Sequence, residues 1–233
     1  QLAKLKFNLI LVARREQRLK QIQKELAENY HVKVIYFCHD LTNMEEVDAL
    51  ISQLTNFAID LIVNAAGFGT RGYFFEKPVQ PELEMMDLHM KTPVKIVHAL
   101  LPQMIESKRG VIINISSTGA FVYQAKNLIY GRTKTFLNAF SANLQKEVAN
   151  YGIKVQAFCP GYTRTEFHEV DFFEGFDKRK IPKHLWQSPV NNVVYSLKKL
   201  SSHKTFVIPG IKYKLAAYFM QKGWFTRLIS FFS

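Results

Sequence analysis

The chain has 233 residues, of which 48% are hydrophobic and 21% are charged, so it has enough apolar mass for the core of one domain or two small ones. Its formal net charge of +12 is compatible with three kinds of partner: nucleic acid, phosphate-bearing ligands and anionic membrane surfaces. Nucleic acid is disfavoured, because the lysines and arginines are spread along the chain without a long basic run. No apolar run is long enough to span a bilayer. The cysteines, Cys38 and Cys159, each end an apolar run; we expect buried, reduced thiols and no metal site.

Strand and helix patterns alternate along most of the chain. Continuous apolar runs predict strands at 8–13, 33–38, 59–65, 111–115, 154–158 and 205–208. Helical spacing of apolar residues predicts helices at 16–29, 44–54, 82–106 and 129–151. Such alternation produces right-handed crossovers and a parallel sheet covered on both faces. The expected architecture is therefore α/β, a doubly wound, Rossmann-like, three-layer α/β/α domain over residues 1–233.

A dinucleotide-binding domain of this type begins with a strand, a glycine loop and a helix. Here Leu2–Leu5 is interpreted as the end of that first helix, so the first strand and its loop are expected to be missing from this chain. The sequence has one Gly-x-Gly-x-x-Gly pattern, at Gly67, Gly69 and Gly72, but prolines rather than a helix pattern follow it. We interpret it as a flexible loop where a ligand approaches the backbone, in preference to a phosphate loop.

Four short motifs follow the predicted strands in order. They are Asn-Ala-Ala-Gly at 64–67, Asn-Ile-Ser-Ser at 114–117, Tyr-Gly-Arg-Thr-Lys at 130–134 and Pro-Gly-Tyr-Thr-Arg-Thr at 160–165. Together, these motifs resemble those of the short-chain dehydrogenase/reductase family, and the resemblance extends from Asn8 to about Ile208. In sheets of this kind, ligands bind at the carboxyl ends of the strands, which is where the motifs fall.

The third motif has a chemical rationale. Tyr130 and Lys134 are four residues apart, so they share one face of a helix, and a nearby ammonium group favours the phenolate form of tyrosine. The resemblance implies that Ser117 hydrogen-bonds the substrate oxygen, and that Tyr130 protonates this oxygen as hydride arrives from a nicotinamide cofactor. His89 stands where the family often has an asparagine that helps to hold a proton-relaying water. Both a relay role and an ordinary helix histidine remain open for it.

The resemblance also implies a set of cofactor contacts, in which Asp40 lies at the adenine and the two threonines at the nicotinamide carboxamide. The set is Arg14, Asp40, Leu41, Asn64, Ala65, Ala66, Gly67, Tyr130, Lys134, Pro160, Gly161, Thr163 and Thr165. Asp40 could equally cap the helix at 44–54, and the threonines could cap the segment after them. The place of the acid that selects NAD is taken by Ala13, followed by arginines, which bind a 2′-phosphate; NADP(H) is therefore expected. The alternative is that these arginines only begin a solvated helix.

Residues 166–188 are expected to form a lid over the substrate. Its apolar side chains indicate an apolar carbonyl or alcohol: Phe167, Phe172, Phe173, Phe176, Leu185 and Trp186. The tail, residues 210–233, mixes aromatic and basic residues in two helical stretches separated at Gly223. It is expected either to pack in the core or at a subunit interface, or to lie on a membrane surface.

The predicted function is hydride transfer between NADP(H) and an apolar carbonyl or alcohol, by a cytoplasmic homodimer or homotetramer. The alternative is a catalytically impaired binding or regulatory protein. This alternative follows from the missing glycine loop, without which the pyrophosphate of NADP(H) is expected to bind poorly.

Overall fold

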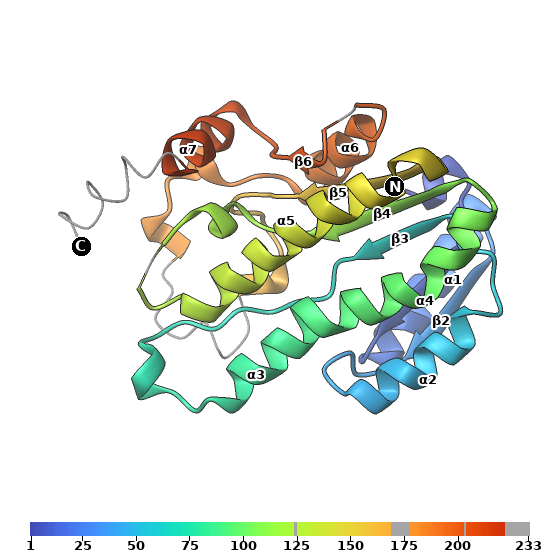
Figure 1. Ribbon diagram of the computed structural model, residues 1–233. Helices are drawn as coiled ribbons and strands as arrows, with labels where there is room; N and C mark the ends of the chain where they lie inside the picture. Colours follow the sequence, from blue (N-terminus) through green and yellow to red (C-terminus); the bar gives the residue numbers. More distant parts are fainter. Residues whose placement is uncertain (124, 169–177, 203, 222–233) are drawn as a thin grey trace.

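The computed structural model describes residues 1–123, 125–168, 178–202 and 204–221. Within these residues, parallel strands alternate with helices that cover both faces of the sheet layer, which confirms the predicted α/β fold (Figure 1). The strands are β1 (Leu9–Ala13), β2 (Val34–Cys38), β3 (Leu61–Asn64), β4 (Gly110–Ile115), β5 (Ile153–Phe158) and β6 (Phe206–Val207). The helices are α1 (Glu16–Tyr30), α2 (Met44–Leu54), α3 (Gln80–Met86), α4 (Thr92–Glu106), α5 (Leu128–Val148), α6 (Pro189–Lys199) and α7 (Ile211–Gln221).

The strands form two parallel sheets. β1 pairs with β2, and β3 to β6 pair in chain order. No strand within the described residues lies between β1 and β3, so both have an unpaired edge, and Val63 of β3 is 40% exposed. One core nevertheless joins the two sheets, because Ile10 and Val12 of β1 pack against the cluster that contains Ile62 and Ile112.

The long helix expected at 82–106 is divided. It begins two residues earlier, at Gln80, and a π-helical turn at Asp87–Lys91 separates α3 from α4. Such turns insert one residue into the helical repeat and are frequent at functional sites. This one contains His89, which is 1% exposed.

The glycine-rich loop after β3 does not open a helix, in agreement with the interpretation that it is no phosphate loop. A short 3-10 turn at Phe74–Glu76 follows it. The loop is fastened rather than flexible: Gly72 N donates to Lys126 O at 3.0 Å, and the buried Glu82 accepts from Thr70 (2.6 Å) and Lys77 (2.8 Å).

Two C-terminal helices differ in how well the sequence predicted them. α6 was missed, although Ser188 caps it by accepting from Asn191 N and Pro189 occupies its first turn, both ordinary start signals. α7 confirms the first helical stretch of the tail, and the second lies outside the described residues.

The cysteines differ in exposure. Cys159 is fully buried, as expected, but Cys38 is exposed, because it ends β2 at the open carboxyl edge of the smaller sheet. In the described ranges, no three His, Cys, Asp or Glu side chains are grouped so as to hold a metal ion. Nor do these ranges contain a helix long and apolar enough to cross a bilayer.

Candidate active site

The carboxyl end of β4 and the first turns of α5 bring together Ser117, Tyr130 and Lys134. Ser117 follows β4 closely, and its hydroxyl oxygen accepts from Gly119 N at 3.0 Å. The tyrosine lies within reach of a hydrogen bond to Ser117, and the lysine Nζ lies 5.7 Å from the centroid of the tyrosine ring. Gly131 permits this approach, since a Cβ there would lie 3.2 Å from Gly119 O. The sequence expectation that these three residues meet agrees with this geometry.

Lys134 is only 5% exposed, and its amine donates to Ile115 O at 2.9 Å. Burial penalises the charged ammonium and lowers the pKa of Lys134 from 10.5 to about 7. An amine with this pKa gains and loses a proton readily near neutral pH, which is what a proton relay requires.

Tyr130 departs from the sequence expectation. Burial raises the pKa of its phenol to about 12, and the hydrogen bond with Ser117 opposes this rise without cancelling it. Desolvation of the ring hydroxyl is the larger of these two effects, so the protonated phenol is favoured over the phenolate. At neutral pH Tyr130 therefore carries its proton.

His89 is buried between the site and the loop after β3. Its ring centroid lies 5.9 Å from that of Tyr130 and 6.3 Å from that of Phe68. The hydroxyl of Thr133 donates its one proton to Tyr130 O at 2.9 Å. Thr133 Oγ1 must therefore accept the hydrogen bond that it shares with His89 Nδ1, also at 2.9 Å. Hence Nε2 of the neutral ring is an acceptor. It is buried and has no hydrogen-bond partner within the described residues.

The environment of His89 keeps its ring neutral. Burial, together with the nearby Lys134, holds the pKa of this imidazole well below 6.5. Its Nε2 faces Gly67, where an added Cβ would lie 2.5 Å away, so the glycine and the histidine fit each other.

Two asparagines lock the ends of β3 and β4. Asn64 Nδ2 donates to Asn114 Oδ1 at 2.8 Å, across paired positions of the two strands, and Asn114 Nδ2 donates to Ser141 Oγ at 2.9 Å. The side chain of Asn64 is therefore engaged in joining the strands. Ala65, Ala66 and Gly67, which follow it, are exposed, so their backbone is accessible to a ligand.

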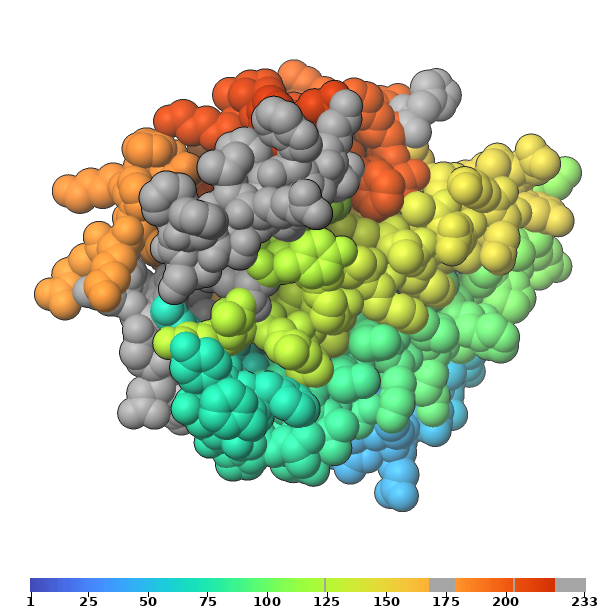
Figure 2. Space-filling view, turned by 60° about the vertical axis from the view of Figure 1, so that its left-hand side comes forward, coloured from blue at the N-terminus to red at the C-terminus, as the bar shows by residue number. Residues whose placement is uncertain are grey.

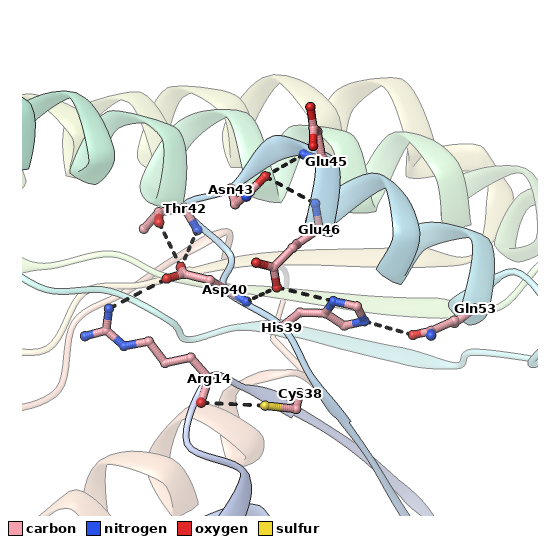
Figure 3. A network of polar contacts seen from close by, with 9 residues as sticks. All are labelled: Arg14, Cys38, His39, Asp40, Thr42, Asn43, Glu45, Glu46 and Gln53. Atoms are coloured by element: carbon pink, nitrogen blue, oxygen red, sulfur yellow. Dashed lines mark hydrogen bonds and ion pairs between the residues drawn. The ribbon is translucent and has the colours of Figure 1, made fainter.

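Asp40 lies at the carboxyl end of β2 in a polar network (Figure 3). Its carboxylate accepts from Thr42 N at 2.9 Å and Thr42 Oγ1 at 2.8 Å, and it lies 3.9 Å from the Arg14 guanidinium. Burial raises the pKa of Asp40, but these hydrogen bonds and the arginine together lower it by more, so the net shift of the pKa is downward. Asp40 is not a helix cap, because Asn43 caps α2 by accepting from Glu45 N. Leu41 packs into the core instead of lining an open surface.

Two further arginines, Arg15 and Arg18, follow the carboxyl end of β1. Arg15 and Arg18 both bind the carboxylate of Glu166, each at 3.1 Å. All three side chains are more than half exposed, so this corner holds an anion with guanidinium groups that solvent can reach. Its donor chemistry suits a phosphate as well as a carboxylate.

The Pro-Gly motif after β5 is held by residues that the sequence did not single out. Tyr213 of α7 packs its ring directly on Gly161, where no Cβ would fit, and its hydroxyl accepts from Tyr162 N at 3.1 Å and donates to Leu185 O at 2.8 Å. Thr163 donates to Gly161 O at 3.0 Å, and Asn192 donates to Thr163. The roles of Tyr213 and Asn192 have no sequence signal, because they depend on contacts between residues that are far apart in the chain. Thr165 accepts from Phe167 N at 3.3 Å, as a cap would, and Pro160 O accepts from Thr118 N.

This arrangement, a buried Tyr-x-x-x-Lys pair beside a serine at the end of β4, agrees with the comparison to protein families. A family model described as short chain dehydrogenase matches residues 1–172. The chain belongs to the short-chain dehydrogenase family.

Relatives and solved structures of this family resemble most of the chain. An uncharacterized oxidoreductase of Staphylococcus epidermidis is 31% identical over 82% of this chain and 80% of its own length, and one of Staphylococcus aureus is 33% identical over 81% and 79%. A short-chain dehydrogenase from Sphingobium yanoikuyae in complex with NADPH has a TM-score of 0.85 at 27% identity, covering 98% of this chain and 88% of that one. A 7beta-hydroxysteroid dehydrogenase, with a TM-score of 0.86 at 20% identity and coverage of 98% and 89%, shares the fold. The protein is therefore an oxidoreductase of a family that uses nicotinamide cofactors.

The buried lysine of this short-chain dehydrogenase allows activity and stability to be separated. Because the folded pKa is about 7 and the unfolded value is 10.5, the unfolded chain holds an extra proton between these pH values, and stability rises with pH across that window. We predict that Lys134→Met abolishes turnover, leaves the melting temperature at pH 7 unchanged or higher, and flattens its rise with pH. Thermal unfolding at a series of pH values tests this. Lys146→Met, at an exposed position of α5, serves as the control and should keep both activity and the pH slope.

His89 should make the protein sensitive to mild acid. Its folded pKa lies well below 6.5, so the unfolded chain takes up a proton that the folded protein does not, and stability falls as the pH drops through 6.5. The slope can reach about 1.4 kcal/mol per pH unit. We predict that His89→Asn reduces this slope in urea unfolding between about pH 6.5 and 5. His98→Asn, which changes an exposed histidine of α4, should leave it unaltered; equal slopes in all three proteins would contradict the assignment.

Proposed function

We propose that this oxidoreductase transfers hydride between NADP(H) and an apolar carbonyl compound or the corresponding alcohol. The observation that carries the proposal is the grouping of Ser117, the protonated Tyr130 and the buried Lys134 at the carboxyl end of β4. The three side chains supply a hydrogen bond to the substrate oxygen, an acid, and an amine that can restore the acid's proton.

The proton route follows from the pKa values. In carbonyl reduction, Tyr130 gives its proton to the substrate oxygen while Ser117 holds that oxygen. Lys134, whose pKa is about 7, then returns a proton to the tyrosine. His89 contributes an acceptor, Nε2, close to this route, and we propose that a water bound there takes the place of the water that the family's asparagine helps to hold. With its pKa at about 12, Tyr130 carries its proton at neutral pH, which is the form that reduction of a carbonyl requires.

Aromatic rings around the acid indicate the substrate class. Phe167 lies 5.6 Å from Tyr130 between ring centroids, and Trp186 lies 5.7 Å from Tyr162. Both belong to the expected lid, residues 166–188, and Phe68 approaches from the other side, next to His89. These rings favour an apolar substrate. The lid's Phe172, Phe173 and Phe176 lie outside the described residues.

The residues at the ends of β1, β2 and β3 fit a phosphorylated nicotinamide dinucleotide. Arg14 and the guanidinium groups that bind Glu166 would hold the 2′-phosphate, Asp40 would face the adenine, and the exposed 65–67 backbone would border the adenosine. Thr163 and Thr165, next to Pro160 and Gly161, would bind the carboxamide. When bound, the nicotinamide supplies or accepts the hydride. The NADPH in the Sphingobium yanoikuyae relative supports the choice of NADP(H).

The remaining expectations complete the proposal. Assembly as a homodimer or homotetramer and a cytoplasmic location stay predictions. The grouping of acid and lysine favours an active enzyme over an impaired binding or regulatory protein. The membrane contact expected of the tail, residues 210–233, also stays a prediction, and residues 222–233 of this tail lie outside the described residues.

Tyr130 provides the test of the chemistry. We predict that Tyr130→Phe lowers kcat by at least about 100-fold, because the ring remains but the proton donor is lost. NADPH affinity, measured by fluorescence titration, should stay within about twofold, since the hydroxyl adds little to cofactor binding. Substantial residual turnover would show that another group donates the proton.

Arg14 provides the test of cofactor choice. We predict that the unaltered protein prefers NADPH to NADH, and that Arg14→Asp reduces this preference at least about tenfold, because a carboxylate repels the 2′-phosphate that the guanidinium attracts. The measurement is kcat/KM for both cofactors. Lys24→Asp, an equal change of charge on the exposed side of α1, should leave the preference unchanged. Equal use of both cofactors by the unaltered protein would refute NADP(H) selectivity.

A further inference from the structure

The positive charge of this protein is concentrated in one part of the chain. Residues 1–177 contain 20 lysines and arginines against 19 aspartates and glutamates, so they are almost neutral. Residues 178–233 contain 11 lysines and arginines and no acidic residue. The basic residues are indeed spread along the sequence, but only the last part lacks the acids that would balance them.

This basic segment forms one edge of the molecule. Its described portion includes α6, β6 and α7, which lie together along the top of the fold, coloured orange to red (Figure 1). In the space-filling view, the same colours gather along the upper part of the molecule, away from the blue residues of the N-terminal part (Figure 2). The described elements of this acid-free segment therefore lie together in space as well as in sequence.

α7 combines an exposed apolar stripe with lysines on both of its margins. Ile211 is 67% exposed and Leu215 is 50% exposed, and they are four residues apart, on one face. At 100° per residue, Lys212 and Lys214 fall on opposite sides of this stripe. Tyr213, which packs on Gly161, lies on the reverse face of the helix. This is the side-chain distribution of a helix that lies flat in a lipid–water interface.

α6 adds a second cationic element next to α7. Lys199 of α6 and Lys214 of α7 both lie over the ring of Tyr195, with Nζ at 5.6 Å and 5.5 Å from its centroid. Two ammonium groups therefore share one aromatic ring in a segment without carboxylates. α6 also exposes Val190, Val193 and Val194.

We propose that this basic face, made by Lys199, Lys212, Lys214, Ile211 and Leu215 around Tyr195, docks the protein on an anionic phospholipid bilayer. The lysines attract the headgroups, and the aliphatic side chains enter the acyl boundary. A nucleic acid would leave the aliphatic side chains without an apolar partner. A second copy applied through the same face would set two acid-free, positively charged surfaces against each other. The reverse face of α7 contacts the Pro-Gly loop through Tyr213, so docking would place this loop directly behind the membrane-facing helix.

Co-sedimentation of the full chain with vesicles tests the proposal and does not depend on enzymatic activity. We expect the protein to pellet with vesicles that contain about 30 mol% phosphatidylglycerol in phosphatidylcholine, and not with pure phosphatidylcholine. Raising the salt from about 0.1 M to about 0.5 M should release most of it. Pelleting with neither kind of vesicle would overturn the proposal.

Matched variants locate the contact. Lys199→Glu with Lys214→Glu should weaken binding at least about tenfold, whereas Lys24→Glu with Lys33→Glu, the same charge change on exposed lysines near the smaller sheet, should weaken it by no more than about threefold. Ile211→Asn with Leu215→Asn should also weaken it at unchanged charge. Equal losses in the two charge variants would reduce the effect to net charge and overturn the docking face.

Two further measurements distinguish lipid docking by this face from contacts made by the tail, by a second copy or by nucleic acid. After deletion of Gly223–Ser233, the protein should still bind the anionic vesicles, and the Lys199 and Lys214 changes should still weaken this binding. Complete loss of vesicle binding on deletion would assign the contact to the tail alone. Sedimentation velocity should show the same oligomeric state for the Ile211 and Leu215 variant as for the unaltered protein. Dissociation of an oligomer in that variant would assign the face to a second copy. Binding to an oligonucleotide that is tighter than binding to vesicles, and that the Ile211 and Leu215 changes leave unaltered, would assign it to nucleic acid.

Discussion

The burial of one amine organises the candidate site. Lys134 sits almost without solvent contact beneath Tyr130, and its amine donates to the carbonyl of Ile115, the last residue of β4. Holding it there requires α5 to pack closely on β4 and on the loop after it, which Gly131 permits. The same burial lowers the pKa of the lysine and raises that of the tyrosine, so one packing arrangement sets the protonation of both groups.

The site is held from three directions by contacts that have no part in proton transfer. The pair of asparagines ties β3 to β4, and the π-helical turn places His89 against Gly67. On the third side, Tyr213 of α7 fixes the Pro-Gly loop. α7 thereby connects the active site to the basic face, since its two sides serve the two regions. Chemistry and membrane docking would then depend on one helix.

The sequence by itself determined the fold class and suggested most of the candidate catalytic residues. Parallel-sheet strands are buried on both faces, so they appear as continuous apolar runs, and residues four apart on a helix must share a face. These local rules place Ser117 just after a strand and Tyr130 and Lys134 on one face of the following helix. The motifs, however, required the resemblance to a known family, because a tyrosine and a lysine at this spacing are common in helices.

Tertiary structure decided what depends on contacts between distant parts of the chain. The exposure of Cys38 has no local signal, because it depends on what packs against the carboxyl end of β2. Desolvation raised the pKa of Tyr130, whereas a neighbouring ammonium alone would lower it, and the hydrogen bond that Thr133 donates to Tyr130 O determined the tautomer of His89. Burial and the geometry of hydrogen bonds are properties of the packed chain. They set the pKa values and donor roles that residue types alone leave open.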